Sequence, residues 1–259
     1  MSDTPAPLQP LTAASLGTVR HGFFTRRGGV SEGPFASLNC SVFGRDDRAL
    51  VMENRARAAT HLGVDLAALV GLRQVHGREA VTVTAPWPAE AAPAADALVT
   101  DRPGIALGIV TGDCAPVLFA DAAAGVIGAA HAGWRGAVAG VLESTVAAML
   151  RLGAARARIV AVVGPCIAQA SYEVGADVRE ALHAAGDDTA ALFAPGRRSG
   201  HWQFDLPGLC LSRLRAAGVA RAEATGHDTL ADPARFFSYR RQTLAGGGPI
   251  GHQLSAIVL

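Results

Sequence analysis

The chain has 259 residues, of which 50% are hydrophobic and 17% charged, and its formal net charge is +1 at pH 7. This composition predicts a compact globular protein with a large core, and the near-neutral charge creates no long-range field that favours nucleic acid. No uncharged apolar run approaches about 18 residues, so the sequence predicts no membrane span.

The N-terminal segment, residues 1–19, is expected to form a polar, proline-containing tail ahead of one domain over residues 20–259. It lacks the basic and apolar regions of a signal peptide, which favours a cytoplasmic protein. The four cysteines form no CxxC pair, and scattered cysteines in a chain of this size indicate reduced thiols rather than a disulfide framework.

In the first half of the chain, a helix is predicted over residues 46–62, where Asp46 or Asp47 caps its start and a glycine follows its end. Apolar runs bounded by turn residues then predict four strands. These strands cover residues 81–84, 105–111, 116–120 and 125–130.

In the second half, helices are predicted over residues 136–152 and 205–218, with further strands over 158–163 and 254–259. Helices and strands therefore alternate along the chain. This order predicts an α/β fold, in which a mixed sheet system is flanked by helices within a single domain.

Two chemically reactive residues, Cys114 and His131, are predicted to meet at one end of a hairpin. A four-residue loop at 121–124 would pair residues whose numbers add up to 245, which places Cys114 opposite His131 on the same face. A turn displaced by one residue is expected to break this pairing. Taken separately, each residue has an ordinary structural explanation, as a buried thiol or a hydrogen-bonded imidazole.

A metal centre at this place needs a further ligand, because catalytic zinc usually takes three protein ligands. Among the other seven histidines, the residues alone leave two candidates, His21 and His76, each of which precedes a glycine. The helix predicted from Gly136 would also present its N-terminus beside His131 and attract an anion, with Arg135 adding charge.

Short motifs spread over most of the chain share one resemblance. They are TRRGGVS (25–31), FASLN (35–39), QVHG (74–77), ADALVT (95–100), TGDCAPV (111–117), HAGWRG (131–136), VGPCI (163–167), YEVG (172–175), FDLP (204–207) and FFSYRR (236–241). In this order they resemble the YfiH family, also described as laccase-domain or polyphenol oxidase proteins, peptidoglycan editing factors and purine nucleoside phosphorylases.

The resemblance implies a YfiH-like α/β domain and a catalytic zinc ion held by His76, Cys114 and His131. It also implies an enzyme that is both a transferase and a hydrolase. The implied reactions are phosphorolysis of adenosine, inosine, guanosine and methylthioadenosine, and deamination of adenosine. We expect the partners to be purine nucleosides and phosphate, without nucleic acid or membrane, and the protein to be a monomer.

Four residues are candidates for substrate binding. Asn39 and Arg26 lie in the N-terminal motifs, and Arg135 and Arg240 lie in HAGWRG and FFSYRR. Each also has a structural explanation as a turn residue or a solvated arginine. Where the family often has Cys-Thr and Gly-Arg, this chain has Asp228-Thr229 and Gly251-His252, which bears on substrate preference rather than on metal binding.

Three alternatives remain open at this point. A multicopper oxidase needs on the order of ten paired histidines. This chain has eight and no His-x-His, so any polyphenol oxidase activity would come from copper at the same three ligands. A metal-free cysteine hydrolase would use Cys114 as nucleophile and His131 as base. A peptidoglycan-fidelity factor would act by binding alone.

Overall fold

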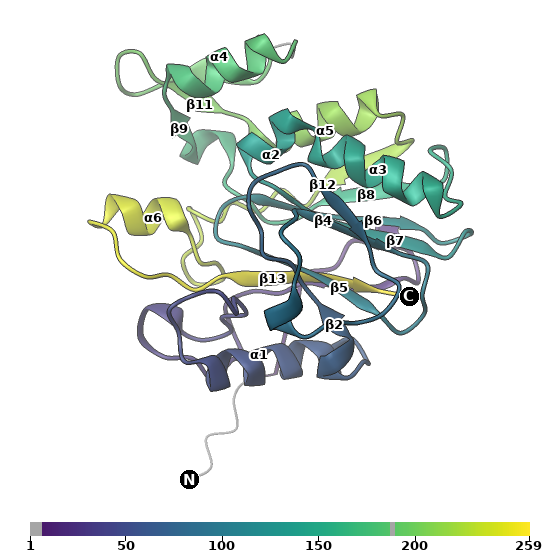
Figure 1. Ribbon diagram of the computed structural model, residues 1–259. Helices are drawn as coiled ribbons and strands as arrows, with labels where there is room; N and C mark the ends of the chain where they lie inside the picture. Colours follow the sequence, from purple (N-terminus) through teal and green to yellow (C-terminus); the bar gives the residue numbers. More distant parts are fainter. Residues whose placement is uncertain (1–6, 187–189) are drawn as a thin grey trace.

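The computed structural model describes residues 7–186 and 190–259, and its centre is a six-stranded mixed sheet (Figure 1). The strand order is β12-β8-β6-β7-β4-β3. The strands are β3 (Ala80–Thr82), β4 (Ala97–Thr100), β6 (Ala115–Asp121), β7 (Val126–Ala132), β8 (Val160–Val163) and β12 (Arg221–Ala224). Both faces of its inner strands are buried, so β6 and β7 are apolar rather than alternating, apart from Asp121 and His131.

A second sheet of four strands packs on one face of the first (Figure 1). Its order is β1-β13-β5-β2, and the strands are β1 (Arg20–Phe23), β2 (Leu69–Val70), β5 (Ala106–Thr111) and β13 (Gln253–Val258). Leu107 and Ile109 of β5 meet Leu118 and Ile127 of the hairpin in the core between the sheets. The neighbouring residue Ala106 points the other way, as the two-residue period of a strand requires.

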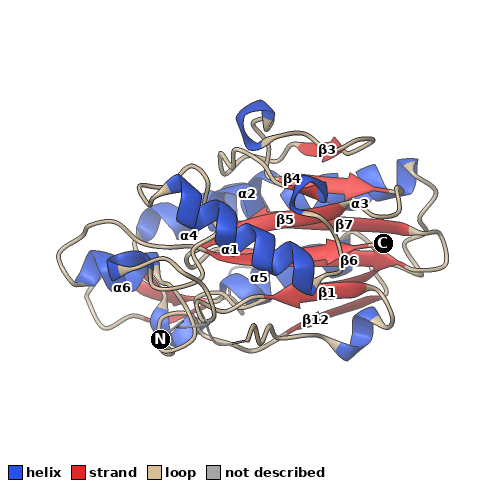
Figure 2. Ribbon diagram, turned by 90° about the horizontal axis from the view of Figure 1, so that it is seen from below, coloured by secondary structure: helices blue, strands red, loops and turns tan. Residues whose placement is uncertain are grey.

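Helices cover the two outer faces. α2 (Trp134–Ala139), α3 (Val141–Arg151) and α5 (Leu206–Ala216) lie on the free face of the six-stranded sheet. α1 (Arg48–His61) lies across the strands of the four-stranded sheet, as Figure 2 shows. The remaining elements are α4 (Ala176–Ala184), α6 (Tyr239–Leu244) and a small sheet of β9 (Glu173–Val174), β10 (Phe193–Pro195) and β11 (Trp202–Phe204). The predicted α/β fold is thus confirmed.

The three predicted helices are present, but the middle one is two helices. α1 begins after Asp47, whose carboxylate accepts the Ala49 amide. Gly140 has a φ of 97°, in the left-handed region that favours glycine, and it separates α2 from α3. The prediction of one long helix that begins at Gly136 is therefore wrong. The helix N-terminus beside His131 belongs to α2, which has six residues. The expected anion site at the start of a long helix is thus not formed.

The hairpin is present, but its predicted register is wrong by two residues. Pro116, not Cys114, lies opposite His131, because the loop occupies residues 122–125 and Gly125 takes a φ of 61° there. When a four-residue loop moves by one position, each residue of one strand pairs with a residue two positions away on the other. Side chains two positions apart on a strand point to the same face of the sheet. Cys114 and His131 therefore stay on one face as diagonal neighbours, and the displaced turn does not separate them.

The described part of the expected N-terminal tail packs against the domain. Leu11 exchanges backbone hydrogen bonds with Phe23, and Ala13 and Leu16 are buried in the core between the sheets. The tail prediction for residues 7–19 is thus corrected: alternating apolar residues let this segment extend the sheet edge. Residues 1–6 lie outside the described residues. No helix of the described part of the chain is long and apolar enough to cross a membrane.

Candidate metal centre

The structure brings together His76, Cys114 and His131. Cys114 immediately precedes β6, His131 lies near the end of β7, and His76 lies between β2 and β3. The three ligand atoms lie within 4.8 Å of one another. The Cys114 Sγ to His76 Nε2 distance is 3.9 Å, and the two imidazole rings meet edge to face with centroids 4.7 Å apart.

One buried carboxylate, Asp96, holds the loop that carries His76. Its oxygens accept the backbone amides of Val75, His76 and Gly77 at 3.2, 2.9 and 2.6 Å. His76 has a φ of 60°, which is uncommon for a residue other than glycine. The three hydrogen bonds stabilise this conformation and fix the position of the imidazole.

The same carboxylate orients His131. β4 and β7 pair Ala97 with Ala130, so Asp96 lies opposite His131 at the next step of the ladder. Asp96 Oδ1 accepts a hydrogen bond from His131 Nδ1 at 2.8 Å. Because Nδ1 is the donor, Nε2 is the nitrogen that remains for a metal, as is common in histidine sites with an acidic partner.

Small residues let the cluster close. A Cβ on Gly133 would lie 2.9 Å from Cys114 Sγ and 3.0 Å from His76 Cδ2. A Cβ on Gly136 would lie 3.0 Å from the carbonyl oxygen of Gly77. These two glycines of the HAGWRG motif therefore allow α2 and the His76 loop to approach each other.

The cluster is strongly coupled electrostatically. Burial raises the pKa of the Cys114 thiol, but His131 and His76 outweigh burial and lower the pKa to about 6. Burial lowers the pKa of His131, whereas Cys114 and Asp96 raise it to about 9. The cysteine is thus poised as a thiolate, the form that acts as a metal ligand or a nucleophile.

Arg240 lies against Tyr172, and Arg240 and Arg135 both act electrostatically on the Tyr172 hydroxyl. The Arg240 guanidinium lies 5.2 Å from the centre of the Tyr172 ring and donates to the Glu173 carbonyl at 2.7 Å. The pKa of Tyr172 lies above its ordinary value, because burial and the neighbouring Cys114 raise it more than Arg240 and Arg135 lower it. Arg135 is exposed and covers the ring of Trp134 at 4.4 Å.

The other two predicted substrate residues have structural partners. Asn39 is fully buried; its Nδ2 donates to Asp46, and its Oδ1 accepts the amides of Ser41 and His252. Arg26 donates to the Ala36 carbonyl at 2.7 Å and lies 4.4 Å from the centre of the Phe237 ring. Among the described residues, neither makes a hydrogen bond with the three ligand residues.

Both departures from the family pattern lie near the centre. Asp228 accepts hydrogen bonds from Ser171, Ala168 and Leu230 and so fixes the segment before Tyr172. Burial and the charge of His131 lower the pKa of His252 to about 4. His252 Nδ1 is buried and has no hydrogen-bond partner among the described residues.

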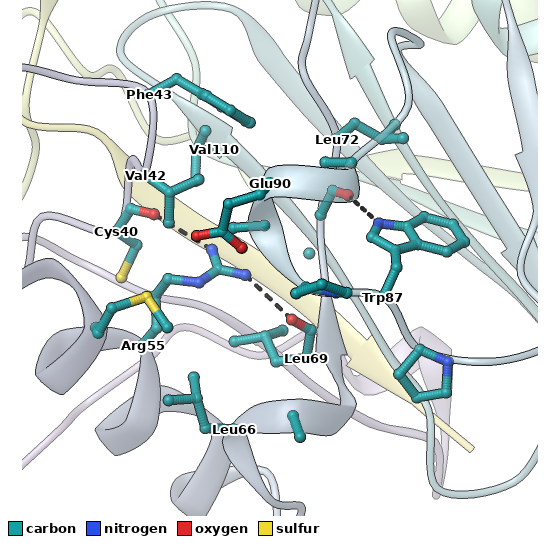
Figure 3. Close-up of a pocket in the computed structure, with 18 of the residues that line it drawn as sticks. Cys40, Val42, Phe43, Arg55, Leu66, Leu69, Leu72, Trp87, Glu90 and Val110 are labelled. Carbon is teal, nitrogen blue, oxygen red and sulfur yellow. Dashed lines mark hydrogen bonds between the residues drawn. The ribbon is translucent and has the colours of Figure 1, made fainter. Parts of the chain in front are cut away.

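A cavity of about 650 Å³ lies between α1, the loop at residues 86–92 and β5 (Figure 3). Apolar side chains, among them Leu72, Trp87 and Val110, form much of its lining. The buried Arg55 at its wall donates to the carbonyls of Cys40 and Leu69, both at 3.2 Å, and pairs with no carboxylate in the described part of the chain. Gln74, two residues before His76, also lines the cavity, so the cavity adjoins the loop of the metal centre.

Asp96 is the functional residue that sequence reasoning missed. Asp96 lies in the motif ADALVT, where it is the one charged residue of an apolar run. Because a charged side chain is rarely buried without a partner, its position in this run could have indicated a structural or functional role. Its partner His131 lies 35 residues further along the chain and becomes a neighbour only through the pairing of β4 with β7.

The chain is similar over most of its length to one family of known proteins. Residues 20–259 match the family model described as multi-copper polyphenol oxidoreductase laccase. A Streptomyces griseus protein named purine nucleoside phosphorylase ORF3 is 43% identical over 240 residues, which cover 92% of this chain and 96% of the relative. A Deinococcus radiodurans protein named purine nucleoside phosphorylase is 46% identical over 237 residues, covering 91% and 89%.

Solved structures share the same fold. The crystal structure of a Bacillus licheniformis hypothetical protein, YfiH, superposes with a TM-score of 0.89 at 31% sequence identity. The match covers 98% of this chain and 97% of that chain. The resemblance drawn from the motifs is thus confirmed.

Proposed function

Because the chain belongs to the multi-copper polyphenol oxidoreductase laccase family, with relatives named purine nucleoside phosphorylase, we propose that it is a zinc-dependent purine nucleoside phosphorylase. The observation that carries the proposal is the His76, Cys114 and His131 cluster, whose ligand atoms lie within 4.8 Å of one another. In this proposal the three residues are the metal ligands of one catalytic domain over residues 20–259.

The donor set fits a zinc ion. One thiolate and two imidazoles are ordinary zinc ligands, and three protein ligands leave a position open for substrate, as in catalytic zinc sites. Copper also accepts these donors, and it is the second metal that we propose for this centre. Among the described residues, His76, Cys114 and His131 are the one group of three or more histidine, cysteine, aspartate or glutamate side chains close enough to share a metal, which argues for a single metal rather than a multicopper assembly.

In the proposed reaction, an oxygen of phosphate attacks C1′ of the ribose and the glycosidic bond breaks. The base leaves with the bonding electrons and takes up a proton, and the other product is ribose 1-phosphate. Bound zinc would supply positive charge that stabilises developing negative charge. The protein's part is to hold phosphate and nucleoside in line, which removes most of the entropic barrier to their meeting.

Charge and shape suggest where each substrate lies. Arg240 and Arg135 stand beside Tyr172 and suit the phosphate, because guanidinium groups bind phosphate oxygens in pairs. The cavity next to the His76 loop suits the purine, since its volume falls in the range of small-molecule sites and its apolar walls match a flat base. Arg26 and Asn39, as structural supports of the N-terminal loop, remain weaker candidates for substrate contact.

We propose deamination of adenosine as a second activity of the same centre. In that reaction water replaces the amino group at C6, which gives inosine and ammonia. The proposal rests on the family resemblance and on a cluster able to hold a metal that activates water. We also propose that the protein works in the cytoplasm as a monomer.

One experiment separates these activities. The protein, purified without chelator, is incubated with adenosine in the presence and absence of phosphate, and the products are separated by chromatography. Phosphorolysis gives adenine and ribose 1-phosphate only with phosphate. Deamination gives inosine without phosphate, and with phosphate it gives inosine together with the hypoxanthine that phosphorolysis of inosine releases. Adenosine that stays unchanged in both samples, at one zinc per chain, would contradict the proposed function.

A cysteine hydrolase is the second candidate, because His131 lies close to Cys114 and lowers the pKa of its thiol. Such an enzyme would keep its activity after the metal is removed. Loss of activity on dialysis against a chelator, with recovery on addition of zinc, favours the phosphorylase.

A further inference from the structure

We infer that Asp113 is a positioning residue that holds Arg240 beside the metal centre. The inference rests on the proposed function, which assigns Arg240 to phosphate. Asp113 immediately precedes Cys114, and its carboxylate bonds to two segments that lie far along the chain.

Three donors converge on this carboxylate. Thr229 Oγ1 donates to Oδ1 at 2.6 Å, and Ser238 Oγ and the Arg240 amide donate to Oδ2 at 3.0 and 2.6 Å. The carbonyl oxygen of Asp113 also accepts the Ile167 amide at 2.9 Å. The loop of Cys114 is therefore tied to the start of α6 by direct hydrogen bonds.

The consequence falls on the Arg240 side chain. Because its backbone is fixed by Asp113, its guanidinium reaches the Glu173 carbonyl and lies over the ring of Tyr172. Asp113 is itself the residue directly before Cys114 in the chain. A single carboxylate thus sets the distance between a metal ligand and a phosphate-binding cation.

A carboxylate suits this place because it accepts all three hydrogen bonds with charged oxygens. An asparagine keeps one neutral oxygen and presents an NH₂ group on the other side. If that oxygen faces the Arg240 amide, the Thr229 hydroxyl must turn to accept from the NH₂ group; if it faces Thr229, the Arg240 amide loses its acceptor.

The test is a double-mutant cycle on phosphate binding. Inorganic phosphate is titrated calorimetrically into the zinc-loaded wild type, Asp113→Asn, Arg240→Ala and the double variant. We expect Asp113→Asn to raise the Kd of phosphate about tenfold, with zinc content unchanged, and to have no further effect in the Arg240→Ala background. An equal effect of Asp113→Asn in both backgrounds would overturn the inference, because Asp113 would then not act through Arg240.

Asp121→Asn is the matched control. Asp121 is a fully buried carboxylate at the other end of β6, where it accepts from Arg158 and the Ala155 amide. We expect this variant to be less stable but to keep the wild-type Kd, and a raised Kd would show that loss of any buried carboxylate suffices. If Asp113→Asn does not fold, Thr229→Val, which removes the donor to Oδ1 and leaves the Ser238 cap of α6 in place, enters the same cycle with the same expectation.

Failure of the proposed function is recognised separately. If the wild type binds no phosphate and Arg240→Ala changes nothing, then the assignment of Arg240 is wrong and the inference falls with it. If the wild type binds phosphate through Arg240 but Asp113→Asn binds equally well, only the inference about Asp113 is wrong.

Discussion

Asp96 and His131 form a buried pair, with Oδ1 of the carboxylate 2.8 Å from Nδ1 of the imidazole. The same carboxylate accepts the backbone amide of His76 at 2.9 Å. The Asp96 side chain therefore orients two of the three cluster residues. It binds His131 through its imidazole ring and His76 through its backbone amide.

Replacing Asp96 with asparagine tests this relationship. Asparagine cannot accept all four hydrogen bonds, so both imidazoles lose their fixed orientation. We expect zinc affinity to fall about 10- to 100-fold, as for other carboxylates that support histidine ligands. Competition with a chromophoric chelator measures the affinity. An unchanged affinity in a folded variant would show that Asp96 does not orient the ligands.

The choice between the two sequence candidates for the third ligand can be tested by a pair of variants. His76→Ala removes a cluster atom, and we expect it to abolish both bound zinc and phosphorolysis of inosine. His21→Ala is the control, because His21 bonds to the backbone of Ala13 and Val19. It should lose some stability and keep its zinc. Full activity of His76→Ala without metal is incompatible with the proposed centre.

The reactivity of Cys114 has a predicted pH dependence in metal-free protein. Its pKa of about 6 makes it a thiolate at neutral pH, so the iodoacetamide rate should rise with pH around a midpoint near 6. The other cysteines, Cys40, Cys166 and Cys210, are buried and burial raises their pKa, so the signal belongs to Cys114.

His131→Asn should move that midpoint upward, toward the ordinary value for a thiol, because it removes the charge that stabilises the thiolate. Mass spectrometry of the alkylated peptide identifies the site. A midpoint that is the same in both proteins would mean that His131 does not stabilise the thiolate.

Gly133 offers a steric test. A Cβ at this position would lie 2.9 Å from Cys114 Sγ, closer than real contacts allow, so Gly133→Ala must displace the thiol or the His76 ring. We expect turnover to fall at least about tenfold, since small displacements of reacting groups have large effects. Gly44→Ala, where the nearest atom is 3.4 Å away, is the control and should keep wild-type turnover.

Much of this arrangement follows from local signals in the sequence. Asp47, which caps α1, and the short loop between β6 and β7 are local features. They predict where α1 begins and that β6 and β7 form a hairpin. Cys114 and His131 lie on one face as expected, although the register behind this expectation is wrong by two residues. The break at Gly140 was missed because an apolar stripe continues across it.

The rest depends on contacts between distant segments. His76 and His21 were equivalent from the residues alone, because only the folded loop after β2 brings His76 against His131. Asp96 became a supporting residue only through the pairing of β4 with β7. Asn39 was expected to contact substrate, yet its side chain is buried and hydrogen-bonds to Asp46, Ser41 and His252.

The central claim is that the His76, Cys114 and His131 cluster holds a zinc ion that is required for phosphorolysis. The most direct measurement combines elemental analysis of protein purified without chelator with product analysis of inosine and phosphate. The account predicts about one zinc per chain, hypoxanthine and ribose 1-phosphate as products, and loss of both zinc and products in His76→Ala. Wild-type protein that forms these products with far less than one metal ion per chain would contradict it.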